Sequence, residues 1–237
     1  MPSLPFTAQP RLQQQIAFIV EIDRLKTILR QTLLTDCSRR ENSAEHSWHL
    51  AVMAVTLAEY APAGADMMRV VQQLLIHDLV EIDAGDTFCY DLVGNQNKAE
   101  RETQAAERIF GLLPGEQAQE LRLLWHEFEA QETPTAQFAA ALDRIQPLLH
   151  NQQTTGGTWK QHKITRAQVM QRIQPVQLGA PALWPFVVQL IDDAVAVGHL
   201  HPYPASAKDY LMHMSVTTLG SKSRKQILRL KANSSLS

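Results

Sequence analysis

Two adjacent ionisable residues, His77 and Asp78, interrupt a segment that is otherwise apolar, Leu-Leu-Ile-His-Asp-Leu-Val. Burying an imidazole and a carboxylate among apolar side chains without partners costs several kcal/mol of folding free energy. A bound metal ion would offset that cost, because both groups are metal ligands. The pair therefore predicts a metal site.

Two further ionisable residues also lie among apolar residues. His46 shares a helical stripe with Leu50, Met53 and Leu57, so its side chain should point inward. Asp143 is a carboxylate within the apolar segment Phe-Ala-Ala-Ala-Leu-Asp-Arg-Ile. Two imidazoles and two carboxylates suit one divalent ion, which could be Mn, Co, Fe, Ni, Zn or Mg. Four protein ligands would leave two positions of an octahedral shell for water and a substrate oxygen, as a hydrolase requires.

Each of these residues also has a purely structural explanation. His46 could be a hydrogen-bonded core histidine, and Asp143 could form an ion pair with Arg144 or Arg101. We favour one shared ion because a single cause then explains all four interruptions.

Two acidic residues follow the His-Asp pair closely enough to act on a substrate. Glu81 lies three residues after Asp78 and four after His77, on the same face of a helix. It could hold or deprotonate the attacking water, or it could be a solvated helix end. Asp86 comes just past Gly85 and could orient that water or a substrate hydroxyl. We expect Glu81 and Asp86 to be catalytic.

The spacing of the apolar residues places these groups on helices. Asn42 and Glu45 resemble a capping box, so a helix should begin there. No strand pattern extends over more than a few residues, and no repeat occurs, so we expect an all-α fold in a single domain. The helices are expected over residues 12–29, 42–60, 66–80, 98–113, 116–130, 135–150, 166–174 and 182–198, with loops at 35–42, 86–97 and 151–165.

Composition and charge limit the class of protein. Of the 237 residues, 45% are hydrophobic and 19% are charged, so a sizeable core is expected. The net charge of −2 argues against binding to nucleic acid polymers. No apolar run approaches the ~18 residues of a membrane span, and Met1 to Pro10 lacks the pattern of a signal peptide. With only Cys37 and Cys89, the chain has no disulfide framework, and we expect a cytoplasmic location.

The two ends of the chain differ from its middle. Residues 1–10 contain three prolines and are expected to form a loose arm, followed by a helical domain over residues 11–219. Residues 220–237 form a basic tail without acidic residues. A solvated, disordered tail explains this charge more simply than a contact with nucleic acid or membrane does.

The combined motifs resemble a known family. The series His46, His77-Asp78 and Asp143 is similar to that of the HD-domain metal-dependent phosphohydrolases. The string from His77 to Thr87, preceded by Glu-Asn-Ser-Ala-Glu-His-Ser, resembles the subgroup of 5′-deoxynucleotidases and their bacterial relatives. The resemblance covers roughly residues 16–198.

The resemblance implies a helical HD-domain bundle, one divalent ion and hydrolysis of a nucleoside monophosphate to nucleoside and phosphate. By resemblance, His46, His77, Asp78 and Asp143 would be the ligands, Glu81 would position or activate the water, and Asp86 would support the site. The family also places a phosphate-binding arginine upstream of the first histidine, and Arg30 is the nearest match. Arg39 or Arg40, which are nearer to His46, could bind phosphate instead.

We therefore expect a phosphohydrolase that acts on a small phosphorylated substrate, most simply a nucleoside 5′-monophosphate, with a preference for the deoxy form. Family members with two metals carry extra histidines between the His-Asp pair and the last aspartate. Only His126 lies in that interval here, so we expect a single metal, and the remaining histidines should be structural or exposed.

Other interpretations remain open at this point. A phosphodiesterase of the same fold is one alternative, and a non-catalytic nucleotide-binding or scaffold protein is another. The apolar face of Trp184, Val187, Val188 and Ile191 could belong to the core or to the surface of a homodimer, and the sequence does not decide between them.

Overall fold

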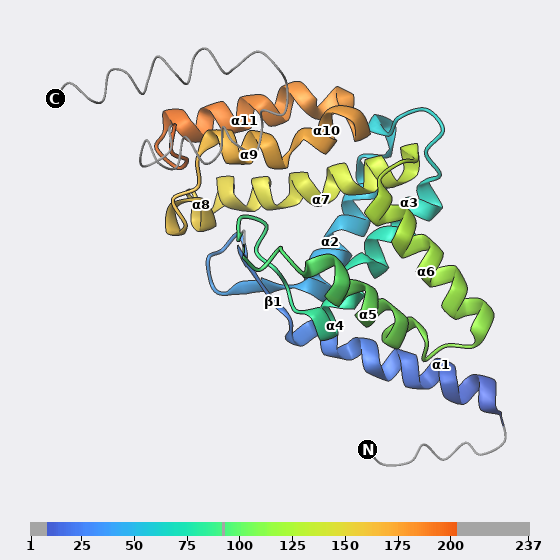
Figure 1. The fold of residues 1–237 in the computed structure, drawn as a ribbon. Helices are drawn as coiled ribbons and strands as arrows, with labels where there is room; N and C mark the ends of the chain where they lie inside the picture. The colour runs from blue at the N-terminus through green and yellow to red at the C-terminus, as the bar shows by residue number, and fades with distance from the viewer. Residues whose placement is uncertain (1–8, 92, 203–237) are drawn as a thin grey trace, which may run out of the picture. The chain divides into compact units, whose positions relative to one another are not determined.

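A long central helix organises the computed structural model, which describes residues 9–91 and 93–202 (Figure 1). This helix, α7, spans Pro134–Gln153 and carries a run of small residues, 139–141, that are fully buried. Small side chains let neighbouring helices approach closely. The helix packs against α2, α3, α6, α8, α10, α11 and β1, so a residue on α7 can meet residues from nearly every part of the fold.

Helices form most of the described chain, which confirms the all-α class. The α-helices are α1 (Pro10–Glu21), α2 (Ser43–Thr56), α3 (Met67–Ile76), α4 (Glu81–Ala84), α5 (Lys98–Phe110), α6 (Gly115–Ala130), α7 (Pro134–Gln153), α8 (Gly157–Gln161), α9 (Arg166–Arg172), α10 (Gln174–Gly179) and α11 (Trp184–Ala196). Short 3-10 helices cover η1 (Ile22–Thr27), η2 (Ala58–Tyr60), η3 (His77–Val80) and η4 (Pro181–Leu183).

A small hairpin replaces the end of the first expected helix. The chain leaves the helical conformation at Ile28, and strand β1 (Leu29–Leu33) pairs antiparallel with β2 (Arg40–Asn42). The expected helix over 12–29 was therefore too long, because its apolar spacing also suits a 3-10 turn followed by a strand. Arg30 consequently lies on a strand rather than on a helix.

The chain around the His-Asp pair changes helix type. The expected helix over 66–80 ends at Ile76, and His77–Val80 continue as the 3-10 helix η3 before α4 begins at Glu81. Gly85 ends α4 with a φ of 75°, a conformation that favours glycine. The expected capping box is confirmed: the Asn42 side chain accepts from the Glu45 backbone, and Glu45 accepts from the Asn42 backbone.

The apolar face of α11 belongs to the core at two of its four positions. Val187 and Ile191 are buried in the cluster of apolar residues around α7, and Trp184 packs against that cluster. Among the described residues, no helix is long and apolar enough to cross a membrane. The expected basic tail at 220–237 lies outside the described residues, as does most of the N-terminal arm, and Pro10 already begins α1.

Candidate metal centre

Four side chains from three parts of the fold converge on one point. His46 comes from α2, His77 and Asp78 from η3, and Asp143 from α7. His46 Nε2 lies 2.9 Å from Asp143 Oδ1, which in turn lies 3.9 Å from His77 Nε2. Asp78 completes the group, with Oδ1 3.1 Å from His77 Nε2 and Oδ2 4.0 Å from His46 Nε2. The structure thus brings together all four of the expected ligands.

The proton positions on the two histidines leave electron pairs facing this point. His77 Nδ1 lies 2.9 Å from the backbone carbonyl of Leu74, so in the neutral imidazole the proton is on Nδ1 and an electron pair is on Nε2, a buried atom that has no hydrogen-bond partner. Burial, together with the charge of Arg30, lowers the pKa of His46 to about 4, so His46 is also neutral at pH 7.

The proton of His46 is held on the side away from Asp143. His46 Nδ1 lies 3.2 Å from Oε1 of Gln146, whose amide nitrogen faces the Glu41 carboxylate at 2.7 Å. A carboxylate accepts hydrogen bonds, so this arrangement fixes the amide orientation and places the His46 proton on Nδ1. The unprotonated Nε2 then faces Asp143 at 2.9 Å, and two electron-rich atoms at this distance favour a bound cation. The donor set therefore fits a metal ion.

A second group of possible metal ligands lies behind His46 and consists of Glu41, His49 and His150. The amide nitrogen of Gln146 lies 3.3 Å from His49 Nδ1 and 3.1 Å from His150 Nε2, in addition to its contact with Glu41. A side-chain nitrogen thus already occupies the space between these three residues. We interpret this group as support for His46 rather than as a metal site.

Glu81 and Asp86 lie beside the four converging residues. Glu81 is buried rather than solvated, and Ser43 Oγ donates to its Oε2 at 2.6 Å. Burial and the charge of Asp78 raise the pKa of Glu81 well above its ordinary value, and burial likewise raises the pKa of Asp86. Carboxyls with raised pKa values beside a pocket are typical of groups that move protons.

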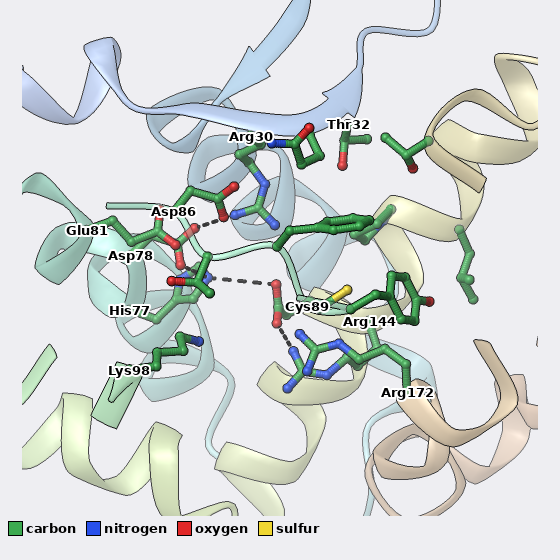
Figure 2. Close-up of a pocket in the computed structure, with 18 of the residues that line it drawn as sticks. Arg30, Thr32, His77, Asp78, Glu81, Asp86, Cys89, Lys98, Arg144 and Arg172 are labelled. Atoms are coloured by element: carbon green, nitrogen blue, oxygen red, sulfur yellow. Dashed lines mark hydrogen bonds and ion pairs between the residues drawn. The ribbon is translucent and has the colours of Figure 1, made fainter. Parts of the chain in front are cut away.

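Of the expected phosphate-binding arginines, only Arg30 lines the pocket with Glu81 and Asp86. Arg30 donates to Asp78 Oδ2 at 2.9 Å (Figure 2). Arg39 instead forms a bidentate, half-exposed ion pair with Glu45, and neither Arg39 nor Arg40 is among the residues that line this pocket. The geometry gives no support to Arg39 or Arg40 as phosphate ligands.

Sequence reasoning missed several residues that support the site or line its pocket. Ser43 could have been noticed within the capping segment, and Gln146 and His150 lie three and seven residues after Asp143, on the same helix face. Arg144 was considered only as a partner of Asp143, and the two do form a close ion pair. Lys98 and Arg172 carry no sequence signal of their own, because only the fold brings them to the pocket.

Comparison with known proteins identifies the family. The sequence model of the HD domain matches residues 22–184, which is more than half of the chain. The chain belongs to the HD-domain family. This HD-domain protein also superimposes on a crystal structure described as a predicted metal-dependent phosphohydrolase from Magnetospirillum magnetotacticum MS-1. That comparison has a TM-score of 0.78 and 57% identity, and it covers 82% of this chain and 100% of the other.

Curated relatives of this HD-domain protein include two mammalian proteins named 5′-deoxynucleotidase HDDC2. The human protein is 30% identical over 135 residues, which is 56% of this chain and 65% of the relative. The Bos taurus protein is 31% identical over 136 residues, which is 56% of this chain and 64% of the relative. The matched segment thus spans just under two thirds of the length of each relative.

Proposed function

We propose that this HD-domain protein is a metal-dependent phosphomonoesterase that hydrolyses nucleoside 5′-monophosphates, preferentially deoxynucleotides. The observation that carries the proposal is the buried, unpartnered Nε2 of His77, which faces Asp78, Asp143 and His46 at the edge of a pocket. A site with four ligand side chains and an adjacent pocket suits the binding of a cation together with a phosphate.

His46, His77, Asp78 and Asp143 would hold one divalent ion. When bound, such an ion withdraws charge from phosphate oxygens and lowers the pKa of water. Burial alone would raise the pKa of Asp143, but the charge of Arg144 and the neighbouring imidazoles of His46 and His77 together outweigh burial, so this carboxyl stays ionised and able to bind a cation.

Glu81 is the group placed to take a proton from the attacking water. Ser43 donates to one of its oxygens and so fixes its orientation, while its position beside Asp78 keeps it within reach of the same pocket. The water oxygen forms the new bond to phosphorus, the ester P–O bond breaks, and the proton taken by Glu81 passes to the leaving oxygen, so the nucleoside leaves as an alcohol. Asp86 lies in the same pocket wall and supports this arrangement (Figure 2).

Arg30 supplies positive charge on the other side of the carboxylates. Burial opposes its charge, but the surrounding carboxyls, with Asp78 and Glu81 foremost, together outweigh burial and raise its pKa, so Arg30 is fully charged. The guanidinium of Arg30, which lines the pocket, would donate to phosphate oxygens. The names of the human and bovine relatives agree with a nucleotide substrate.

The proposal also covers the binding partner, the cellular location and the oligomeric state of the enzyme. Its partner is a small phosphorylated molecule rather than a nucleic acid polymer, and both cysteines are free, as suits the reducing cytoplasm. A homodimer is compatible with the exposed apolar residues Trp48, Val52 and Val55 on one face of α2.

A metal analysis followed by a phosphate-release screen tests the proposal. We expect about one transition-metal ion per chain, and release of phosphate from nucleoside 5′-monophosphates that stops when a chelator is added. Hydrolysis of diesters alone would indicate a phosphodiesterase. A metal-loaded protein that binds nucleotides without releasing phosphate would indicate a non-catalytic binding protein.

A further inference from the structure

The pocket contains more positive charge than Arg30 supplies. Lys98 begins α5, Arg144 follows Asp143 on α7, and Arg172 is the last residue of α9. Lys98 has an acidic partner, since its Nζ lies 3.4 Å from Glu102. The two arginines lie on the wall away from Glu81 and Asp86, as Figure 2 shows. Neither arginine binds the hydrolysed phosphate in the reaction proposed above.

Arg144 is largely shielded from solvent and only partly neutralised. Its side chain is 12% exposed, it forms an ion pair with Asp143, and its Nε has no hydrogen-bond partner. If Asp143 binds a cation, its negative charge is shared and Arg144 keeps an excess of positive charge. A buried cation in that position gains strongly from an additional anion.

Arg172 adds a second guanidinium close to the first. The two side chains line the same pocket and lie next to each other in Figure 2, so two like charges share one poorly solvated place. Within residues 9–91 and 93–202, Arg172 forms no ion pair or hydrogen bond, although it is half-buried. Two adjacent guanidinium groups without a common acid form a suitable clamp for a phosphate group.

Tyr90 contributes a neutral donor to the same wall. Tyr90 lines the same pocket as Arg144 and Arg172, and burial raises the pKa of its hydroxyl. Its hydroxyl has no hydrogen-bond partner in the part of the chain that the structure describes. It is therefore protonated and available to donate to an anion.

We propose that Arg144, Arg172 and Tyr90 form a second anion-binding subsite, so that the preferred substrate is a phosphomonoester that carries a second phosphate group. This inference rests on the proposed function: the first phosphate is hydrolysed at the metal centre, and the second is held at the opposite wall. A nucleoside 3′,5′-bisphosphate has this chemistry, with two phosphates on one sugar.

The test compares deoxyadenosine 3′,5′-bisphosphate with deoxyadenosine 5′-monophosphate as substrates for the full chain. We expect kcat/KM to favour the bisphosphate. In Arg172→Gln this ratio should fall by about 10-fold to 100-fold, the effect of losing charge-assisted hydrogen bonds. Arg166→Gln is the matched control, because it removes a charge from the same helix α9 at an exposed ion pair with Asp192. It should leave the ratio unchanged.

If the ratio of kcat/KM values for the two substrates is unchanged in Arg172→Gln, the inference is overturned. The two arginines would then bind either the hydrolysed phosphate or no phosphate at all. If neither compound is hydrolysed, calorimetric titration with adenosine 3′,5′-bisphosphate separates the two proposals. Binding that weakens at least 10-fold in Arg172→Gln but not in Arg166→Gln would support the subsite while the hydrolase proposal fails. Equal binding by all three proteins would overturn the subsite as well.

Discussion

The side-chain oxygen of Gln146 lies 3.2 Å from Nδ1 of His46, and this contact turns Nε2 of His46 toward Asp143. Gln146 is itself held by Glu41 and His150, and Nδ1 of His150 contacts the carbonyl of Leu33 in β1 at 3.0 Å. The orientation of one expected metal ligand thus depends on residues that reach from α7 to the hairpin.

Replacing Gln146 should weaken metal binding without removing a ligand. Gln146→Leu leaves His46 in place but frees its ring to rotate or change tautomer, so we expect a loss of about 10-fold to 100-fold in metal affinity. Competition with a fluorescent chelator measures this affinity. Gln153→Leu, at an exposed position on the same helix, is the control. Equal affinities in the two variants would show that Gln146 does not orient His46.

Asp78→Ala should abolish both metal content and hydrolysis, because it removes a proposed ligand from the centre of the site. The melting temperature in the presence of added metal should no longer rise above that of the metal-free protein, since binding energy contributes to folding. Asp83→Asn, which changes a surface ion pair with Arg108, is the control. Full metal occupancy in Asp78→Ala would refute the ligand assignment.

Glu81→Gln should separate catalysis from metal binding. The amide keeps the size of the side chain and its contact with Ser43 but cannot accept a proton, so we expect most of the metal to stay and turnover to fall by about 100-fold or more. Metal analysis and initial rates on the same sample measure both effects. Wild-type turnover would mean that Glu81 has only a structural role.

Glu41 predicts how the stability of the metal-free protein depends on pH. Burial raises its pKa in the folded protein from 4.5 to about 7, despite the nearby charge of Arg30. The folded state therefore binds the proton of the Glu41 carboxyl more tightly than the unfolded chain does. This proton binding stabilises the folded state at low pH, and the stabilisation is lost as pH rises from about 4.5 through 7.

Glu41→Gln cannot ionise and should escape that loss. Across this interval its free energy of unfolding should improve relative to wild type by up to about 3 kcal/mol. Urea unfolding at several pH values, with a chelator present, measures the difference. Parallel pH profiles for the two proteins would contradict the assignment.

Substrate choice between deoxyribose and ribose depends on the 2′-hydroxyl. A pocket that buries this group without a hydrogen bond loses about 1–3 kcal/mol, which corresponds to a preference of about 10-fold to 100-fold for the deoxynucleotide. Paired deoxy and ribo 5′-monophosphates, assayed with Mn or Co, measure this preference. Equal rates would remove the deoxy preference and leave the phosphomonoesterase proposal standing.

The helices and the inward direction of His46 followed from the sequence, because apolar residues at helical spacing define a buried face wherever a helix forms. The hairpin, in contrast, was not predicted from the sequence. Leu25, Ile28 and Leu29 continue the helical spacing, yet Ile28 is extended, and β1 is stabilised by pairing with residues around Arg40. The spacing of apolar residues within one segment cannot detect a strand whose hydrogen bonds are made to the other strand of a hairpin.

The sequence by itself determined which groups could bind a metal, since His46, His77, Asp78 and Asp143 interrupt apolar faces at a cost that a cation offsets. Only the tertiary structure decided what surrounds them. Gln146 reaches His46 across the interface of α2 and α7, and Arg172 reaches Arg144 from α9. These contacts join residues that are far apart in the chain, so their effects on tautomer and charge arise from packing and leave no pattern in the local sequence.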